Sequence, residues 1–137
     1  MQSAIFKASL ICKKAVFGPF SYFEMLNCVD ADFSMAELFG TTSFTMATFH
    51  GPFCTVTAFE AEVCFNAVNF EADVDFCGTL FTHKPDFSGA VFSGNTTFAD
   101  AIFEDSAIFD GASFPGRVWV QNIPKDVRER IEAAEHP

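Results

Sequence analysis

Several features common in other proteins are scarce or missing in this 137-residue sequence. It has one Trp and one Tyr, and its 8 basic residues are outnumbered by 18 acidic ones. No apolar run approaches the roughly 18–20 residues of a membrane span, and the start MQSAIF lacks the basic and apolar blocks of a signal peptide. The sequence therefore predicts a cytoplasmic protein without a membrane span.

Recognisable catalytic and metal-binding patterns are also missing. No two cysteines have C-x-x-C spacing, and His50, His83 and His136 are isolated from one another. We expect the cysteines to be small, reduced, buried or half-buried residues. These are Cys12, Cys28, Cys54, Cys64 and Cys77. The sequence predicts no metal site, no cofactor and no catalytic residues, and therefore a protein that is not an enzyme.

Phenylalanine is abundant, with 20 copies, and its spacing is regular. From residue 59 onward the steps between successive phenylalanines alternate between six and five residues. The predicted core ladder is Phe59, Phe65, Phe70, Phe76, Phe81, Phe87, Phe92, Phe98, Phe103, Phe109 and Phe114. Upstream the steps are mostly five. The centres expected there are Phe6, Ile11, Phe17, Phe23, Cys28, Phe33, Phe39, Phe44, Phe49 and Cys54, with the choices near Phe20–Phe23 and Leu38–Phe39 open by one residue.

The residue two positions before each centre is small or β-branched in every unit after residue 56 except at Pro85. Because residues i and i−2 of an extended segment face the same side, each unit is expected to be a short strand with one small and one large inward side chain. The chain must then turn a corner before the next unit. Gly78, Gly89, Asp100 and Gly111 stand where the short corners are expected.

This pattern, written F-x-x-A-x-F with a longer alternate step, resembles the pentapeptide-repeat family, whose usual unit is A-(D/N)-L-x-x. The resemblance implies an all-β fold: a right-handed four-sided β-helix of about five coils over residues 1–116. Four steps sum to 22 residues, so the longer corners would fall on two opposite edges. In such a coil, Leu80 and Ile102 would stack on its outer surface and form a weak candidate contact strip.

A different segment follows the repeat, at residues 117–137. Residues 125–134 predict a short helix after Pro124, with Val127 and Ile131 on one face. We interpret Trp119, Val127 and Ile131 as a cap over the last coil, with an end-to-end homodimer contact as the alternative. The N-terminal end has no visible cap, so it either meets another molecule or continues a longer chain.

Acidic charge is concentrated in residues 60–114, which have ten acidic residues and only Lys84. This argues against direct nucleic-acid binding, because phosphate binding needs basic side chains. The acidic residues considered as a possible interaction surface are Glu60, Glu62, Glu71, Asp73, Asp75, Glu104 and Asp105. They are expected mainly around the long corners, where they would also keep a phenylalanine-rich rod soluble.

The sequence predicts a non-catalytic structural or protein-interaction solenoid with an unidentified protein partner. The alternative comes from the resemblance: some pentapeptide-repeat proteins are acidic, DNA-shaped rods that bind type II topoisomerases such as gyrase in place of DNA. The acidic residues here are expected on opposite edges rather than on one face, which weakens this alternative.

Overall fold

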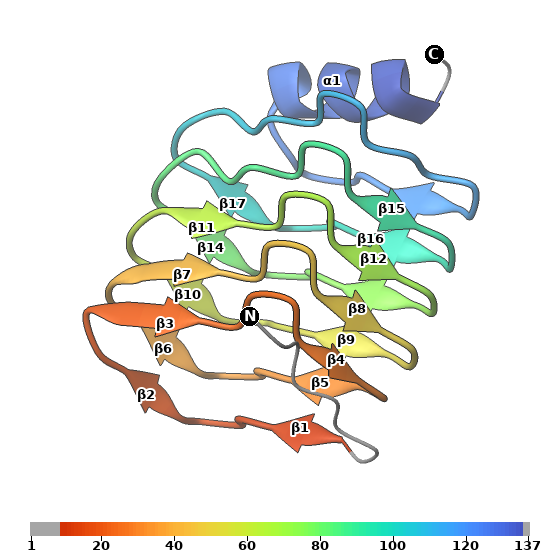
Figure 1. The fold of residues 1–137 in the computed structure, drawn as a ribbon. Coiled ribbons are helices and arrows are strands. Elements are labelled where there is room, and N and C mark those ends of the chain that lie inside the picture. The colour runs from red at the N-terminus through yellow and green to blue at the C-terminus, as the bar shows by residue number, and fades with distance from the viewer. Residues whose placement is uncertain (1–8, 136–137) are drawn as a thin grey trace.

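The chain forms a solenoid of about five coils with one short helix over its C-terminal end (Figure 1). The computed structural model describes residues 9–135. Expected centre Phe6 lies outside these residues. Each coil has four sides, and strands of successive coils pair in parallel. The four-sided coil expected from the repeat is confirmed.

Four parallel sheets form the walls, and each is named here by its first strand. The β1 sheet contains β1 (Leu10–Ile11), β5 (Ala31–Asp32), β9 (Phe53–Cys54), β13 (Val74–Asp75), β16 (Thr96–Thr97) and β18 (Val118–Trp119). The β2 sheet contains β2 (Val16–Phe17), β6 (Glu37–Leu38), β10 (Ala58–Phe59), β14 (Leu80–Phe81) and β17 (Ile102–Phe103).

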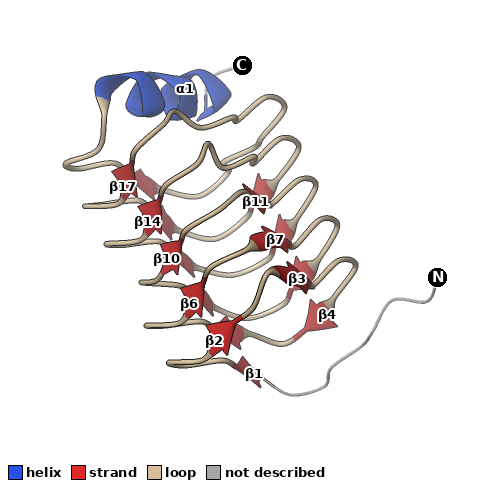
Figure 2. Ribbon diagram, turned by 90° about the vertical axis from the view of Figure 1, so that its left-hand side faces the viewer, coloured by secondary structure: helices blue, strands red, loops and turns tan. Residues whose placement is uncertain are grey.

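The other two sheets complete each coil. The β3 sheet contains β3 (Phe20–Tyr22), β7 (Thr41–Ser43) and β11 (Val63–Cys64), and the isolated bridges Cys64–Asp86 and Asp86–Ile108 extend it. The β4 sheet contains β4 (Asn27–Cys28), β8 (Thr48–Phe49), β12 (Asn69–Phe70) and β15 (Val91–Phe92). Figure 2 shows the strands of successive coils stacked in columns beneath the helix.

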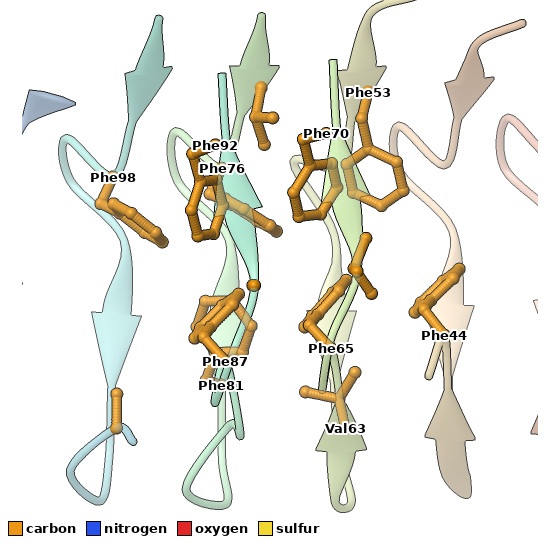
Figure 3. Packing of buried hydrophobic residues seen from close by; sticks show 14 of the residues in the cluster. Phe44, Phe53, Val63, Phe65, Phe70, Phe76, Phe81, Phe87, Phe92 and Phe98 are labelled. Carbon is orange, nitrogen blue, oxygen red and sulfur yellow. The ribbon is translucent and has the colours of Figure 1, made fainter. Parts of the chain in front are cut away.

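The interior is a ladder of stacked rings. All eleven phenylalanines of the predicted core ladder are buried. Phe65 and Phe87 lie parallel with ring centroids 5.0 Å apart, and Phe87 and Phe109 repeat this spacing (Figure 3 shows Phe44, Phe65 and Phe87 in one row). Rings from opposite walls meet edge to face, as Phe65 and Phe76 do at 5.5 Å. Both geometries are favourable for aromatic pairs.

The corners alternate in length as the six-five spacing predicts. Gly78, Gly89, Asp100 and Gly111 all lie in short corners and all have positive φ. The N–H of Thr79 donates to the carbonyl of Phe76 over 3.0 Å, which closes a four-residue turn with Gly78 in third position. A positive φ at that position is typical of a type II turn, which explains why glycine occurs there.

Two of the expected upstream centres, Ile11 and Cys54, are wrong by one residue, and the open choice between Leu38 and Phe39 is decided for Leu38. Cys12, Leu38 and Thr55 point inward, whereas Ile11 and Phe39 are exposed and Cys54 is half-buried on the outer face. The sheet register sets these positions, because Ile11, Asp32 and Cys54 pair on the outer row of the β1 sheet. Backbone pairing therefore overrides the preference of the larger Phe39 for the interior.

The third coil fills its core in an unusual way. Phe53 occupies the small i−2 position, in register with Ala31 and Val74, while Thr55 occupies the large position. The Phe53 ring still lies between two rings of its column, at 6.0 Å from Phe33 and 5.9 Å from Phe76. Thr55 Oγ1 lies 2.6 Å from Thr79 Oγ1, so its buried hydroxyl has a partner.

The C-terminal segment closes the last coil. β18 pairs with β16, so the sheet extends past the expected solenoid boundary at residue 116. Helix α1 (Lys125–Glu135) follows, close to the predicted range of 125–134. Val127 and Ile131 are fully buried beneath it. The hydroxyl of Ser106 in the last coil donates to Asp126 Oδ2 over 2.7 Å and fastens the helix start.

We predict that the sizes of residues 53 and 55 are energetically coupled. Phe53→Val leaves a cavity and Thr55→Phe overfills the coil, each costing about 2 kcal/mol. The double variant restores the Val–x–Phe order of the fourth coil, and its cost falls below the sum by about 1 kcal/mol or more. Urea unfolding of the four proteins measures this. The control is the double variant Phe53→Val with Val127→Ala, because Val127 lies in the distant helix and the two costs should add. Equal coupling energies in the 53/55 pair and the 53/127 pair would contradict the prediction.

Candidate interaction surfaces

Among residues 9–135, the inner face of each wall is filled mainly by packed apolar side chains. In the regular coils its inward residues are a phenylalanine and a small residue, and Val68, Ala90 and Ala107 are fully buried beside the ladder. The ring stacking continues from Phe44 through Phe65 and Phe87 to Phe109. Any binding by this part of the chain therefore has to use the outer faces and corners.

The structure does not gather the seven acidic residues of the predicted interaction surface. Glu60, Glu62, Glu104 and Asp105 lie around the corner between the β2 and β3 sheets. Glu71 and Asp73 lie around the opposite corner, between the β4 and β1 sheets, and Asp75 follows on the outer face of the β1 sheet. The six corner residues therefore form two groups on opposite edges of the rod, as the repeat spacing predicts.

Several aspartates hold the backbone rather than face a partner freely. Asp75 Oδ1 accepts the N–H of Cys77 over 2.8 Å, and Asp86 Oδ1 accepts the N–H of Ser88 over the same distance. Each aspartate precedes an inward centre and its partner follows that centre, so the side chain supports the start of the short corner. Asp73 Oδ1 accepts the N–H of Asn95 in the next coil over 2.9 Å.

Asp32 also accepts hydrogen bonds at the start of a corner, and these bonds change the pKa of its carboxyl group. The side chain and backbone N–H of Ser34 donate hydrogen bonds that lower the pKa of the Asp32 carboxyl below its ordinary value of 3.8, and the charge of Lys13 adds to this effect. Hydrogen bonds to a carboxylate favour its charged form. The acidic charge at this position therefore stabilises the fold.

His50 links three successive coils at the corner after the β4 sheet. Its Nδ1 lies 3.0 Å from Glu71 Oε1 in the coil above, and its Nε2 lies 2.6 Å from Asn27 Oδ1 in the coil below. The ring is exposed and both of its nitrogens already have partners. This arrangement suits a cross-coil brace better than a catalytic base, because a base needs a free nitrogen facing a substrate.

Four of the five cysteine thiols have a raised pKa, which makes them poor nucleophiles at neutral pH. Burial, together with the nearby charge of Asp30, raises the pKa of Cys28 to about 11. Burial is also the main cause that raises the pKa of Cys12, Cys54 and Cys77. Because the thiolate is the reactive form, these thiols resist alkylation and metal binding. Residues 9–135 contain no group of three or more His, Cys, Asp or Glu side chains placed to hold a metal ion.

Two outer faces are hollowed. On the β1 sheet a hollow of about 400 Å³ lies between Asp73, Asp75 and Trp119. A second hollow of about 240 Å³ reaches Ile11 and shares Pro52 and Cys54 with the first, so the two form one groove along this wall. On the opposite β3 sheet a hollow of about 550 Å³ has Glu62, His83, Lys84 and Asp105 at its margins.

Exposed apolar side chains form a second kind of surface, and sequence reasoning missed its main part. The expected strip is present, because Leu80 pairs with Ile102 and Ile102 is exposed. Larger exposures occur in the first coil, at Ile11, Val16, Phe20 and Tyr22. The residue before each inward centre is polar or small in most later coils, and this signal could have found Ile11, Val16 and Tyr22.

The three residues predicted as a cap or dimer contact have different surroundings. Val127 and Ile131 are buried within this chain, so their side chains serve as a cap. Trp119 is partly exposed at the end of the β1 groove and is free to contact a partner. In the part of the chain from Ser9 to Glu135, no helix combines the length and the apolar character that crossing a membrane requires.

Comparisons with family models, with curated proteins and with solved structures find no match to this chain.

We predict that the Asp32–Ser34 turn makes stability depend on pH in the acid range. A carboxyl with a lowered pKa contributes fully above its unfolded value of 3.8, and this contribution is lost as pH falls through the lower folded-state pKa. Asp32→Asn should therefore lower the free energy of unfolding at neutral pH, with a smaller deficit in strong acid. Urea unfolding at several pH values measures the deficit. Ser34→Ala keeps the backbone N–H donor and should give a smaller stability deficit than Asp32→Asn. A deficit of Asp32→Asn that does not change with pH would contradict this account.

Proposed function

We propose that this chain is a non-catalytic protein-interaction module of the cytoplasm. The observation that carries the proposal is the division between a core filled by stacked rings and outer walls that expose apolar side chains beside open grooves. A substrate pocket usually combines concavity with converging, activated groups. The thiols with raised pKa, the braced His50 and the aspartates used in turns are not such groups.

The outer walls suit a partner that binds regularly spaced side chains. A parallel sheet presents side chains at fixed intervals along the rod, and the β1 groove combines the aromatic face of Trp119 with the carboxylates of Asp73 and Asp75. Solenoids bind through such extended surfaces because each repeat contributes one row of side chains. The five free thiols agree with a reducing compartment.

An acidic DNA mimic that binds a type II topoisomerase such as gyrase is a second proposal. The concentration of charge supports it, because residues 60–114 have ten acidic residues and one Lys, a net charge of −9. Asp75 accepts a hydrogen bond within a turn and Asp73 accepts one from the next coil, while the other acidic residues are split between two edges. These roles favour the general interaction module.

A pull-down from bacterial lysate at low salt and at 0.5 M salt separates the two proposals. An interaction module with an apolar contact should retain a specific partner at both salt concentrations, and Trp119→Ala or Ile102→Lys should weaken its capture. Recovery of gyrase or another topoisomerase only at low salt would favour the DNA mimic, because long-range charge attraction is screened at high salt. Recovery of no specific partner at either salt concentration would count against both.

A further inference from the structure

The first coil has an unusually apolar perimeter. The four most exposed large hydrophobic residues of the described chain all belong to it: Ile11 at 71%, Phe20 at 66%, Val16 at 65% and Tyr22 at 64%. They lie on three of its four sides, on the β1, β2 and β3 sheets. Phe20 and Tyr22 also stack on each other, with ring centroids 6.2 Å apart. Clustered exposure of this kind marks a contact surface.

The second coil is polar at the same positions. Ile11 pairs with Asp32, Val16 with Glu37 and Tyr22 with Ser43 in the adjacent coil. Because these residues are paired, they occupy equivalent outward positions in the first and second coils. Solubility alone would favour polar residues at these positions in both coils. At these three outward positions, the first coil is therefore apolar where the adjacent coil is polar.

The end face of this coil is also uncovered among the described residues. β1, β2, β3 and β4 are the terminal strands of the four sheets, and no strand within residues 9–135 pairs with their outer edges. The inward residues Leu10, Phe17 and Phe23 are only partly buried, whereas the fully internal Phe33 and Phe44 are completely buried. At the other end α1 covers the last coil (Figure 1).

The occupant that fits this end is another coil with the same width and the same apolar rim. A second copy cannot offer its C-terminal coil, since α1 covers that end. It can offer its own first coil. Residues 9–29 have Lys13, Lys14 and Glu24 as their only charged residues, so this end has little like-charge repulsion compared with residues 60–114.

We propose that two copies of this chain associate through their first coils across a two-fold axis perpendicular to the rod. The contact is isologous and closed, because each copy contributes the same surface and both outer ends have an α1 cap. Edge strands of the two copies would then run antiparallel, and the rims of Ile11, Val16 and Tyr22 would meet. The inference rests on the proposed role as a protein-binding module and names one partner, a second copy.

The end face of a single slender coil is small compared with the roughly 1,600 Å² buried in a standard protein–protein interface. The dimer is therefore expected to be concentration-dependent. Sedimentation velocity of the full 137-residue chain, from low to high micromolar concentration, should show monomer and dimer in rapid exchange. Val16→Lys and Tyr22→Lys place charges on two sides of the rim and should each weaken association about tenfold or more.

Ile102→Lys is the matched control, because Ile102 lies on the same β2 sheet as Val16, is also exposed, and belongs to the fifth coil. It should leave the dimer unchanged. Circular dichroism and thermal unfolding check that all three variants fold. A wild type that stays monomeric, an assembly larger than a dimer, or equal weakening by Ile102→Lys would each overturn the proposal. None of these outcomes affects the pull-down test of binding to other proteins, so the two proposals fail separately.

Discussion

The structure depends on the agreement between two distances. Paired strands lie about 4.8 Å apart, and aromatic rings stack favourably at nearly the same separation. Parallel phenylalanine rings of successive coils have centroids 4.6–5.6 Å apart in the core, as in the pairs Phe92–Phe114 and Phe49–Phe70. A phenylalanine placed in one coil is therefore in stacking position for the next coil without further adjustment. This explains why one residue type can fill the core where a globular core would need a mixture of shapes.

The same agreement restricts what the rest of each coil can be. Because the rings fill the centre, their small neighbours at i−2 must be residues such as Ala, Val or Thr, and the chain must turn sharply after each ring. The short corners have a positive φ at their third residue, and Gly78 or Gly89 adopts it with least strain. An aspartate directly before the ring stabilises the turn by accepting a hydrogen bond from a backbone N–H, as Asp75 and Asp86 do. Much of the acidic charge that first suggests a ligand surface therefore has a structural reason.

The sequence alone could predict the parts of the fold that repeat, and its errors fall where the repeat is broken. The strict alternation from Phe59 onward predicts the inward residues, the corners and the pairing of Leu80 with Ile102. The choice of Leu38 over Phe39 could not be predicted from size, because backbone register decides which of two neighbours faces inward. The exchange of Phe53 and Thr55 needs three-dimensional packing, since a ring two residues earlier can still reach the same column.

The two ends show what a repeat cannot decide by itself. Every internal coil has its edges paired and its rings covered by its neighbours, so only the terminal coils require a separate solution. At the C-terminal end that solution is local, because α1 buries Val127 and Ile131 over the last coil. At the other end the outer row changes from Asp32, Glu37 and Ser43 to Ile11, Val16 and Tyr22. Polar residues there would suffice for solubility, so the proposed contact with a second copy gives a physical reason for an apolar rim around strands that no other residue of the range 9–135 covers.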